Sequence, residues 1–225
     1  MRYIKLAAMK TETVVVFDLD GTLTKRDTFL PFLFGYLIRK PSRILHVGAL
    51  AWSILLFKTG RITNETLKQH FLAAFLKGAK LQEVKDWAHR YVKFVARRGL
   101  REKVIRQLEE HRAKGHILCI LSASFDLYVP ILANELGVEN VICTEAEFSA
   151  ENRLTGQLAT PNCYGNEKVR RLEEWLRSFN VRPRVVAYGD QLSDIPVLEK
   201  ADQGVLIGRD EVKSLIDYGY LKRRN

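Results

Sequence analysis

The chain has 225 residues, of which 47% are hydrophobic, so it can bury a substantial core, and a disordered protein is excluded. Its 36 Lys and Arg residues against 26 Asp and Glu give a net charge of +10. This charge favours an anionic partner, whether a phosphorylated substrate, an anionic membrane face or a nucleic acid.

The cysteines and the N-terminus indicate where the protein works. Cys119, Cys143 and Cys163 show neither a paired nor a metal-binding spacing, which favours free thiols in a reducing compartment. The apolar part of residues 1–10 is too short for a secretory signal, so export is not expected. We therefore expect a cytoplasmic protein.

The first predicted element is a buried strand over 14–17, because a continuous apolar run is typical of a parallel sheet covered on both faces. It ends in two carboxylates, Asp18 and Asp20, that have no local partner. The block that follows predicts only helices, over residues 28–38, 42–57, 63–76 and 81–97. The third of these has its own start signal, with Thr63 as the N-cap residue.

After Gly99 the pattern changes to alternating helices and strands. Strands are predicted over 116–124, 140–144, 184–190 and 204–208, and helices over 101–114, 126–135, 167–179 and 193–200. Residues 146–159 predict a hairpin. We therefore predict an α/β fold with a doubly wound parallel sheet, in which residues 1–27 and 99–225 form the catalytic core and residues 28–98 an inserted all-helical cap.

Polar side chains follow three of the predicted strands. They are Asp18 and Asp20, then Ser122 and Ser124, then Asp190 with Asp194 shortly after. A single Asp after a strand is commonly only a turn former. Three strand ends that meet at the carboxyl edge of one sheet favour an active site instead. Carboxylates brought together repel one another, and hard oxygen ligands without His or thiolate favour Mg²⁺ as the compensating cation.

Four motifs in order, "FDLDGTLT", "ILSAS", the lysine of "CYGNEK" and "YGDQLSD", resemble those of the haloacid dehalogenase superfamily over residues 13–208. The resemblance implies that Asp18 is a nucleophile forming an aspartyl-phosphate and that Asp20 is the general acid and base. It implies that Lys168 neutralises charge on nucleophile and phosphate. It also implies that the substrate is bound by Gly21, Thr22, Ser122 and Ala123. The Mg²⁺ ligands that it implies are Asp18, Asp20, Asp190 and Asp194.

Two neighbours of Asp20 have expected roles of their own. Gly21 allows a close approach of the backbone, and Thr22 is expected to offer its hydroxyl to Asp20. An acid at the Asp20 position is typical of the phosphatases and phosphomutases of the superfamily. The helical cap resembles that of the phosphoserine phosphatase group, although Gly21 stands where that group has serine.

The sequence is compatible with several classes of substrate. The "CYGNEK" loop and the apolar cap resemble bacterial phosphatidylglycerophosphatase C and related phosphatases, which implies a phospholipid phosphate as substrate. A small soluble phosphomonoester such as phosphoserine is the main alternative. A phosphomutase and a non-catalytic nucleic-acid-binding protein are weaker ones, since the aromatic residues lie inside apolar runs and not among the basic residues.

Residues 28–38 and 44–57 carry no charge. Fourteen helical residues rise only about 21 Å, short of a hydrocarbon core of about 30 Å, so a spanning helix is disfavoured. A buried cap helix is favoured for such a run. The alternative is a hairpin broken at Pro41 that lies on the inner face of an anionic membrane, with basic residues against the headgroups. These are Arg39, Lys40, Arg43, Lys58 and Arg61. For the basic tail, residues 218–225, the sequence is compatible with a frayed end and with a membrane contact.

Overall fold

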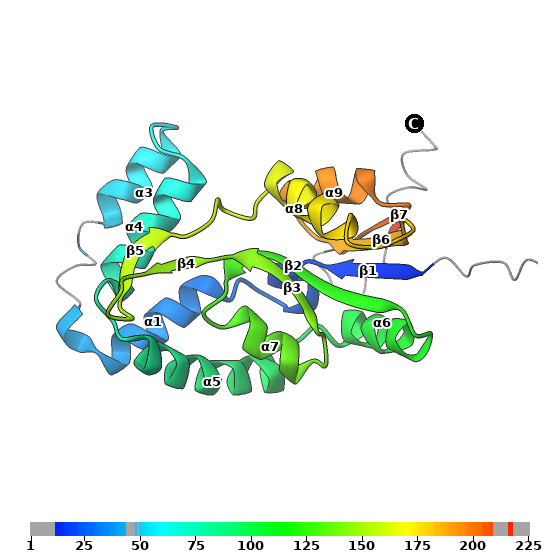
Figure 1. Cartoon of the computed structure of the whole chain (residues 1–225). Helices are drawn as coiled ribbons and strands as arrows, with labels where there is room; N and C mark the ends of the chain where they lie inside the picture. Colours follow the sequence, from blue (N-terminus) through cyan, green and yellow to red (C-terminus); the bar gives the residue numbers. More distant parts are fainter. Residues whose placement is uncertain (1–11, 44–47, 49, 209–215, 218–225) are drawn as a thin grey trace, which may run out of the picture.

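The computed structural model describes residues 12–43, 48, 50–208 and 216–217 (Figure 1). Its main sheet has six strands in the order β3-β2-β1-β6-β7-β8. The strands are β1 (Thr13–Phe17), β2 (Ile117–Phe125), β3 (Asn140–Thr144), β6 (Arg184–Gly189), β7 (Gln203–Leu206) and β8 (Ile216–Asp217). All neighbours pair in parallel except β7 and β8, which pair antiparallel. The sequence did not predict β8.

Helices cover both faces of this sheet (Figure 1). One face carries α8 (Asn166–Leu176) and α9 (Ile195–Lys200), and the other carries α6 (Glu102–Ala113) and α7 (Val129–Glu135). The strand β1 shows why: Val15 and Phe17 belong to one buried apolar cluster, and Val14 and Val16 to the other. A strand buried on both faces reads as a continuous apolar run. The predicted fold class, α/β with a doubly wound parallel sheet, is confirmed, and β8 adds an antiparallel strand at its edge.

The segment between β1 and β2 is helical. It contains a single wide turn (Leu19–Leu23), then α1 (Phe29–Arg39), a 3₁₀ turn (Pro41–Arg43), α3 (Leu50–Lys58), α4 (Asn64–Leu76) and α5 (Leu81–Arg98). The hydroxyl of Thr63 accepts a hydrogen bond from the N–H of Thr66 at 3.1 Å, so the predicted N-cap of α4 is confirmed. The single helix predicted over 42–57 is wrong in its first part, since Pro41–Arg43 forms a separate turn. Residues 44–47 and 49 lie outside the described residues.

The helical segment shares its apolar core with the sheet. One buried cluster contains Phe17 of β1, Phe32 of α1 and Phe75 of α4. The predicted hairpin is present as β4 (Ala146–Phe148) paired antiparallel with β5 (Leu154–Leu158). It packs on α4 so closely that a Cβ on Gly156 would lie 2.8 Å from Ala73. The division into a core of residues 1–27 and 99–225 and a cap of residues 28–98 stays a prediction.

The second apolar run of the segment is not a buried helix. In α3 only Leu50 and Ser53 are buried, whereas the side chains of Trp52 and Leu55 are 61% and 49% exposed. The buried helix favoured by the sequence is therefore wrong for Leu50–Lys58. Within the described ranges no helix combines the length and the hydropathy needed to cross a bilayer. The basic tail over 218–225 lies outside the described residues.

Candidate active site

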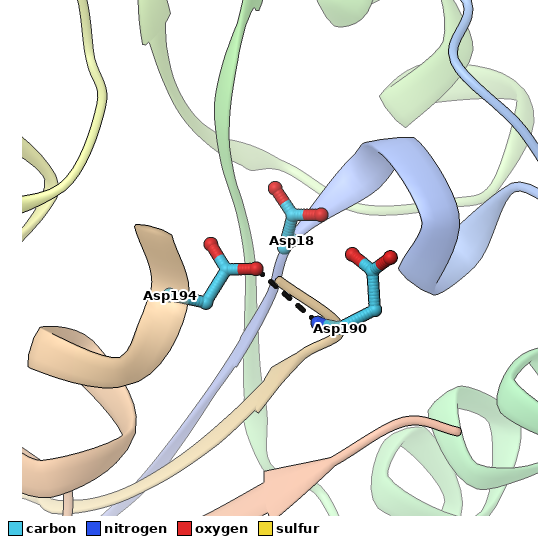
Figure 2. Close-up of side chains that lie close together, drawn as sticks. All are labelled: Asp18, Asp190 and Asp194. Atoms are coloured by element: carbon cyan, nitrogen blue, oxygen red, sulfur yellow. Dashed lines mark hydrogen bonds between the residues drawn. The ribbon is translucent and has the colours of Figure 1, made fainter. Parts of the chain in front are cut away.

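Three carboxylates meet at the carboxyl edge of the sheet (Figure 2). Asp18 follows β1, Asp190 follows the adjacent β6, and Asp194 ends the short turn after it. Each offers a carboxylate oxygen that lies within 4.8 Å of the other two. Asp194 Oδ2 accepts hydrogen bonds from the N–H groups of Asp190 and Gln191, at 3.2 and 3.1 Å. This turn fixes Asp194 beside the strand ends.

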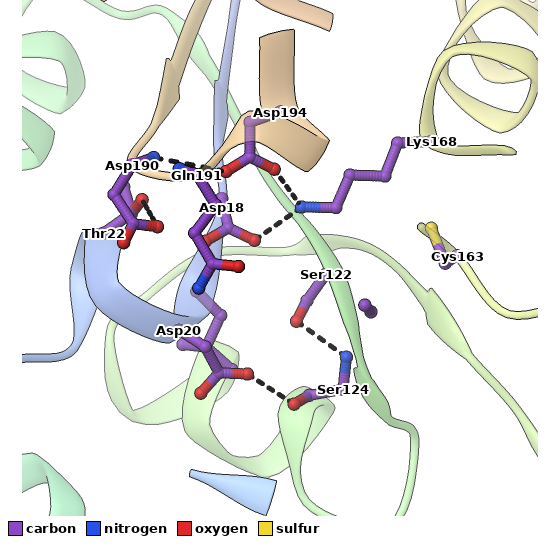
Figure 3. A network of polar contacts seen from close by, with 12 residues as sticks. Asp18, Asp20, Thr22, Ser122, Ser124, Cys163, Lys168, Asp190, Gln191 and Asp194 are labelled. Carbon is purple, nitrogen blue, oxygen red and sulfur yellow. Dashed lines mark hydrogen bonds and ion pairs between the residues drawn. The ribbon is translucent and has the colours of Figure 1, made fainter. Parts of the chain in front are cut away.

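Lys168 bridges two of these carboxylates (Figure 3). From the first turn of α8, its Nζ donates to Asp18 Oδ1 at 2.6 Å and to Asp194 Oδ1 at 2.7 Å. All three side chains are buried. Burial disfavours the ammonium, but Asp18 and Asp194 outweigh it, so the pKa of Lys168 lies above its ordinary value. The lysine therefore stays charged.

One ammonium does not balance three carboxylates. Burial raises the pKa of Asp18 to about 7, Asp194 and Asp20 add to the rise, and Lys168 opposes it. Burial and Asp194 raise the pKa of Asp190 to about 6. Crowded anions make protonation easier, and a bound cation would relieve the same repulsion. A set of oxygen donors without His or thiolate fits Mg²⁺.

Asp20 lies apart from the group of three. Its Oδ1 accepts from the N–H and the hydroxyl of Thr28, at 2.7 and 2.6 Å, and its Oδ2 accepts from the hydroxyl of Ser124 at 2.5 Å (Figure 3). These donors hold the carboxylate toward β2 and α1. The metal role predicted for Asp20 therefore has no support from the position of its carboxylate.

The turn after Asp18 brings Gly21 and Thr22 against Asp190. Gly21 has a φ of +88°, and a Cβ there would lie 2.1 Å from Asp190 Oδ2, so only glycine fits. The predicted close approach of the backbone is confirmed. Thr22 Oγ1 donates to Asp190 Oδ1 at 3.3 Å. Its predicted hydrogen bond to Asp20 is wrong, because the wide turn over Leu19–Leu23 carries it to the β6 side.

The end of β2 supplies Ser122 and Ala123. The buried Ser122 hydroxyl accepts a hydrogen bond from the N–H of Ser124 at 3.0 Å. Its own O–H has no acceptor among the described residues, so it can donate to a substrate oxygen. The carbonyl of Ala123 accepts from Thr144 Oγ1 at 2.9 Å and from Lys68 Nζ at 2.7 Å.

A cavity of about 190 Å³ opens over this site. Asp18, Asp20, Lys168, Asp194 and Ser124 line its floor, and Asn64 and Lys68 of α4 line it from the helical segment. A larger hollow of about 450 Å³, between α8 and α9, is not lined by Asp18, Asp190 or Asp194. The chemistry of the lining therefore selects the smaller cavity as the candidate active site.

Sequence reasoning missed Lys68. Its Nζ donates to Ala123 O and, at 2.9 Å, to Asn162 Oδ1, which uses two of its three N–H donors. Burial lowers its pKa to about 8, while Asp20 opposes the shift. No motif marks Lys68; the only signal is that it lies four residues after Asn64, on the same face of one helix.

The residues around this site match a known family. Residues 15–199 match the model of the haloacid dehalogenase-like hydrolases. The chain is 34% identical over 200 residues to Protein CicA of Caulobacter vibrioides, covering 84% of this chain and 83% of that protein. It is 26% identical over 217 residues to phosphoserine phosphatase of Archaeoglobus fulgidus, covering 96% of this chain and 58% of that protein.

The fold is found among solved structures. One of these, of a phospho-aspartyl intermediate analogue of phosphoserine phosphatase, superposes with a TM-score of 0.55. The two are 18% identical, over 85% of this chain and 84% of the other. The family resemblance predicted from the four motifs is thus confirmed. The chain belongs to the haloacid dehalogenase-like hydrolases and is a phosphatase-type member of that family.

Proposed function

We propose that this phosphatase is a Mg²⁺-dependent phosphomonoester hydrolase that works through an aspartyl-phosphate on Asp18. The observation that carries the proposal is the buried bridge of Lys168 between Asp18 and Asp194, beside Asp190 and under a cavity. A carboxylate can approach a phosphate dianion only when cations screen the repulsion between them. Asp18, Asp190 and Asp194 would hold Mg²⁺, which when bound would neutralise charge on the nucleophile and the phosphate.

In the first half-reaction, a carboxylate oxygen of Asp18 forms a bond to phosphorus, and the bond from phosphorus to the ester oxygen breaks. Asp20 gives its proton to the departing alkoxide, which leaves as an alcohol. In the second half-reaction, Asp20 takes a proton from a water molecule that attacks the phosphorus. The acyl-phosphate bond breaks, which regenerates the Asp18 carboxylate and releases inorganic phosphate.

Three groups would orient the phosphoryl group during both steps. Lys168 Nζ lies 2.6 Å from the nucleophilic carboxylate and neutralises charge there. The O–H of Ser122 and the backbone at Ala123 would hold phosphate oxygens, as the resemblance implies. Ser124 and Thr28 hold the carboxylate of Asp20 away from Lys168 (Figure 3). The acid and the nucleophile thus approach one phosphate from different directions.

For the substrate, we propose the phosphate of a phospholipid such as phosphatidylglycerophosphate, hydrolysed in the cytoplasm at the inner face of the membrane. The exposed apolar side chains of α3, close in the chain to the cavity-lining Asn64, support this class. The relative named phosphoserine phosphatase supports the alternative, a small soluble ester. The cavity of about 190 Å³ accommodates the phosphoryl end of either.

The test is phosphate release from phosphatidylglycerophosphate in detergent, lysophosphatidate, phosphoserine and para-nitrophenyl phosphate, with Mg²⁺ and with EDTA. Asp18→Asn should abolish turnover, and Asp86→Asn, on the exposed side of α5, should not change it. Preference for the lipids would support the proposed substrate class, and preference for phosphoserine would replace it. Metal-independent turnover, or turnover by Asp18→Asn, would contradict the mechanism.

A further inference from the structure

The helix α3 exposes large apolar side chains on the face that points away from the molecule. Leu50 and Ser53 of α3 are buried, and Ser53 Oγ lies 2.9 Å from Nδ1 of His70 on α4. Trp52 and Leu55, on the other side of α3, are 61% and 49% exposed. Clustered exposed apolar groups of this size are typical of an interaction surface.

The stretch of sequence that carries these side chains is basic. Between Thr28 and Asn64 the sequence contains no Asp or Glu but has five Lys and Arg residues. Two of them, Lys58 and Arg61, are exposed at the C-terminal end of α3. We call Trp52, Leu55, Lys58 and Arg61 the docking face. An apolar patch beside two exposed cationic side chains is complementary to an anionic lipid surface, in which the indole ring of a tryptophan lies at headgroup depth.

The docking face is close in the chain to the candidate active site. Residues 59–63 connect α3 to α4, and Asn64 and Lys68 in the first turns of α4 line the cavity above Asp18. Ser53 and His70 also join the two helices side by side. A lipid surface in contact with α3 would therefore lie near α4, which borders the cavity that a headgroup phosphate could enter.

We propose that the docking face binds the protein peripherally to anionic membranes and brings the cavity to the headgroup layer. Binding is reversible and in plane, since α3 is too short to cross the bilayer. Delivery of a lipid substrate rests on the proposed function, but docking itself does not.

The experiment is flotation of the full chain with vesicles of phosphatidylcholine alone and of phosphatidylcholine with phosphatidylglycerol. The wild type should float only with the anionic vesicles. Trp52→Ser with Leu55→Ser should lower the partition coefficient by about tenfold or more, because two apolar groups no longer enter the interface. Lys58→Gln with Arg61→Gln should lower it by about fivefold per charge, and added salt should mimic that loss.

Matched controls come from α5, where Phe94 is 58% exposed and Lys93 is also exposed. Phe94→Ser and Lys93→Gln should float like the wild type. All variants should hydrolyse para-nitrophenyl phosphate equally, so loss of docking is distinguishable from loss of the phosphatase site. Trp52 emission should shift to the blue with anionic vesicles, as judged by the difference from Trp52→Phe.

Three outcomes would overturn the proposal. One is absence of binding to anionic vesicles, and another is binding that the docking-face variants leave unchanged. The third is a wild-type dimer in sedimentation that becomes a monomer in Trp52→Ser with Leu55→Ser and does not bind vesicles, since the face would then cover a second copy of the chain.

Discussion

Thr28 donates two hydrogen bonds to the same carboxylate oxygen of Asp20, one from its N–H at 2.7 Å and one from its hydroxyl at 2.6 Å. Since the hydroxyl hydrogen goes to Asp20, the hydroxyl of Tyr128, 2.9 Å away, donates to Thr28 in turn. The carbonyl of Thr28 accepts from the hydroxyl of Tyr91 at 2.7 Å. The orientation of Asp20 is thus tied to the start of α1 and to α5.

We expect Thr28→Val to lower kcat with little change in KM. The variant keeps the backbone donor but loses the hydroxyl donor to a charged group, a bond of about 1.5–3 kcal/mol. Such a loss in the transition state corresponds to roughly a tenfold to hundredfold decrease in kcat. Steady-state kinetics on para-nitrophenyl phosphate measure it.

The matched control for this prediction is Thr28→Ser, which retains the hydroxyl and should stay near wild type. Equal rates for the valine and serine variants would mean that the backbone N–H and Ser124 alone orient Asp20. Both variants should unfold cooperatively, but Thr28→Val should be the less stable of the two, because it removes the acceptor of the buried Tyr128 hydroxyl.

Much of the fold could be predicted because its signals are local. The apolar run of β1 predicted a strand buried on both faces, and the Thr63 hydroxyl predicted the start of α4. The carboxyl ends of parallel strands share one edge, so the meeting of Asp18, Asp190 and Asp194 could be expected from spacing and topology. The assignment of roles to these residues stays a proposal.

The rest depends on tertiary packing that no local pattern encodes. Thr22 turns to Asp190 and not to Asp20, because the wide turn after Asp18 sets its direction. Lys68 reaches the cavity because its side chain extends from α4 to the carbonyl of Ala123 in β2. The apolar sequence of α3 is compatible with burial and with exposure alike, and only its packing on α4 decides which side chains are covered.

Gly21→Ala should lower both stability and Mg²⁺ affinity. A left-handed backbone costs a non-glycine residue about 1–2 kcal/mol. In addition, the new Cβ would lie 2.1 Å from Asp190 Oδ2 and would displace that carboxylate. Thermal unfolding and Mg²⁺ titration followed by activity measure the two effects.

Gly60→Ala separates the cost of the left-handed backbone from the effect of the clash with Asp190. Gly60 has a similar φ of +71°, but a Cβ there would have no atom of the described residues within 4 Å. It should show the loss of stability from the backbone without the loss of Mg²⁺ affinity. If the two variants bind Mg²⁺ equally well, the contact between Gly21 and Asp190 does not matter for the metal site.

Lys68→Met should lower kcat/KM for phosphomonoesters by about tenfold, since removal of the ammonium takes one hydrogen-bond donor from the backbone oxygen of Ala123 and one from the side-chain oxygen of Asn162. It also removes a positive charge from the cavity. Lys85→Met, on the exposed side of α5, is the control and should behave like wild type. An unchanged kcat/KM in Lys68→Met would limit Lys68 to a structural contact.

The raised pKa values at the carboxylate site predict how stability depends on pH without metal. The pKa of Asp18 is raised from 3.8 to about 7 and that of Asp190 from 3.8 to about 6, in both cases first by burial. These groups bind protons more tightly in the folded chain than in the unfolded chain. Their contribution to the free energy of unfolding is therefore largest below about pH 4 and is lost as the pH rises to about 7.

Mg²⁺ should replace this lost stabilisation, because it neutralises the carboxylates that the protons have left. We expect the increase in Tm on adding Mg²⁺ to metal-free protein to be small at about pH 5 and larger at about pH 7.5. Differential scanning fluorimetry with Mg²⁺ and with EDTA at each pH measures it.

Other groups titrate in the same range, so only the difference between the Mg²⁺ and EDTA curves is informative. Burial lowers the pKa of His111 to about 4, so the free energy of unfolding rises with pH between about pH 4 and 6.5 on account of this residue. Burial raises the pKa of Asp126 to about 6, which has the opposite effect. Neither His111 nor Asp126 belongs to the cluster of Asp18, Asp190 and Asp194, so their contributions are the same with Mg²⁺ and with EDTA and cancel in the difference. Asp190→Asn should flatten the pH dependence of the Mg²⁺ effect. An effect of equal size across this range would mean that the proton and the metal do not compete for Asp18 and Asp190.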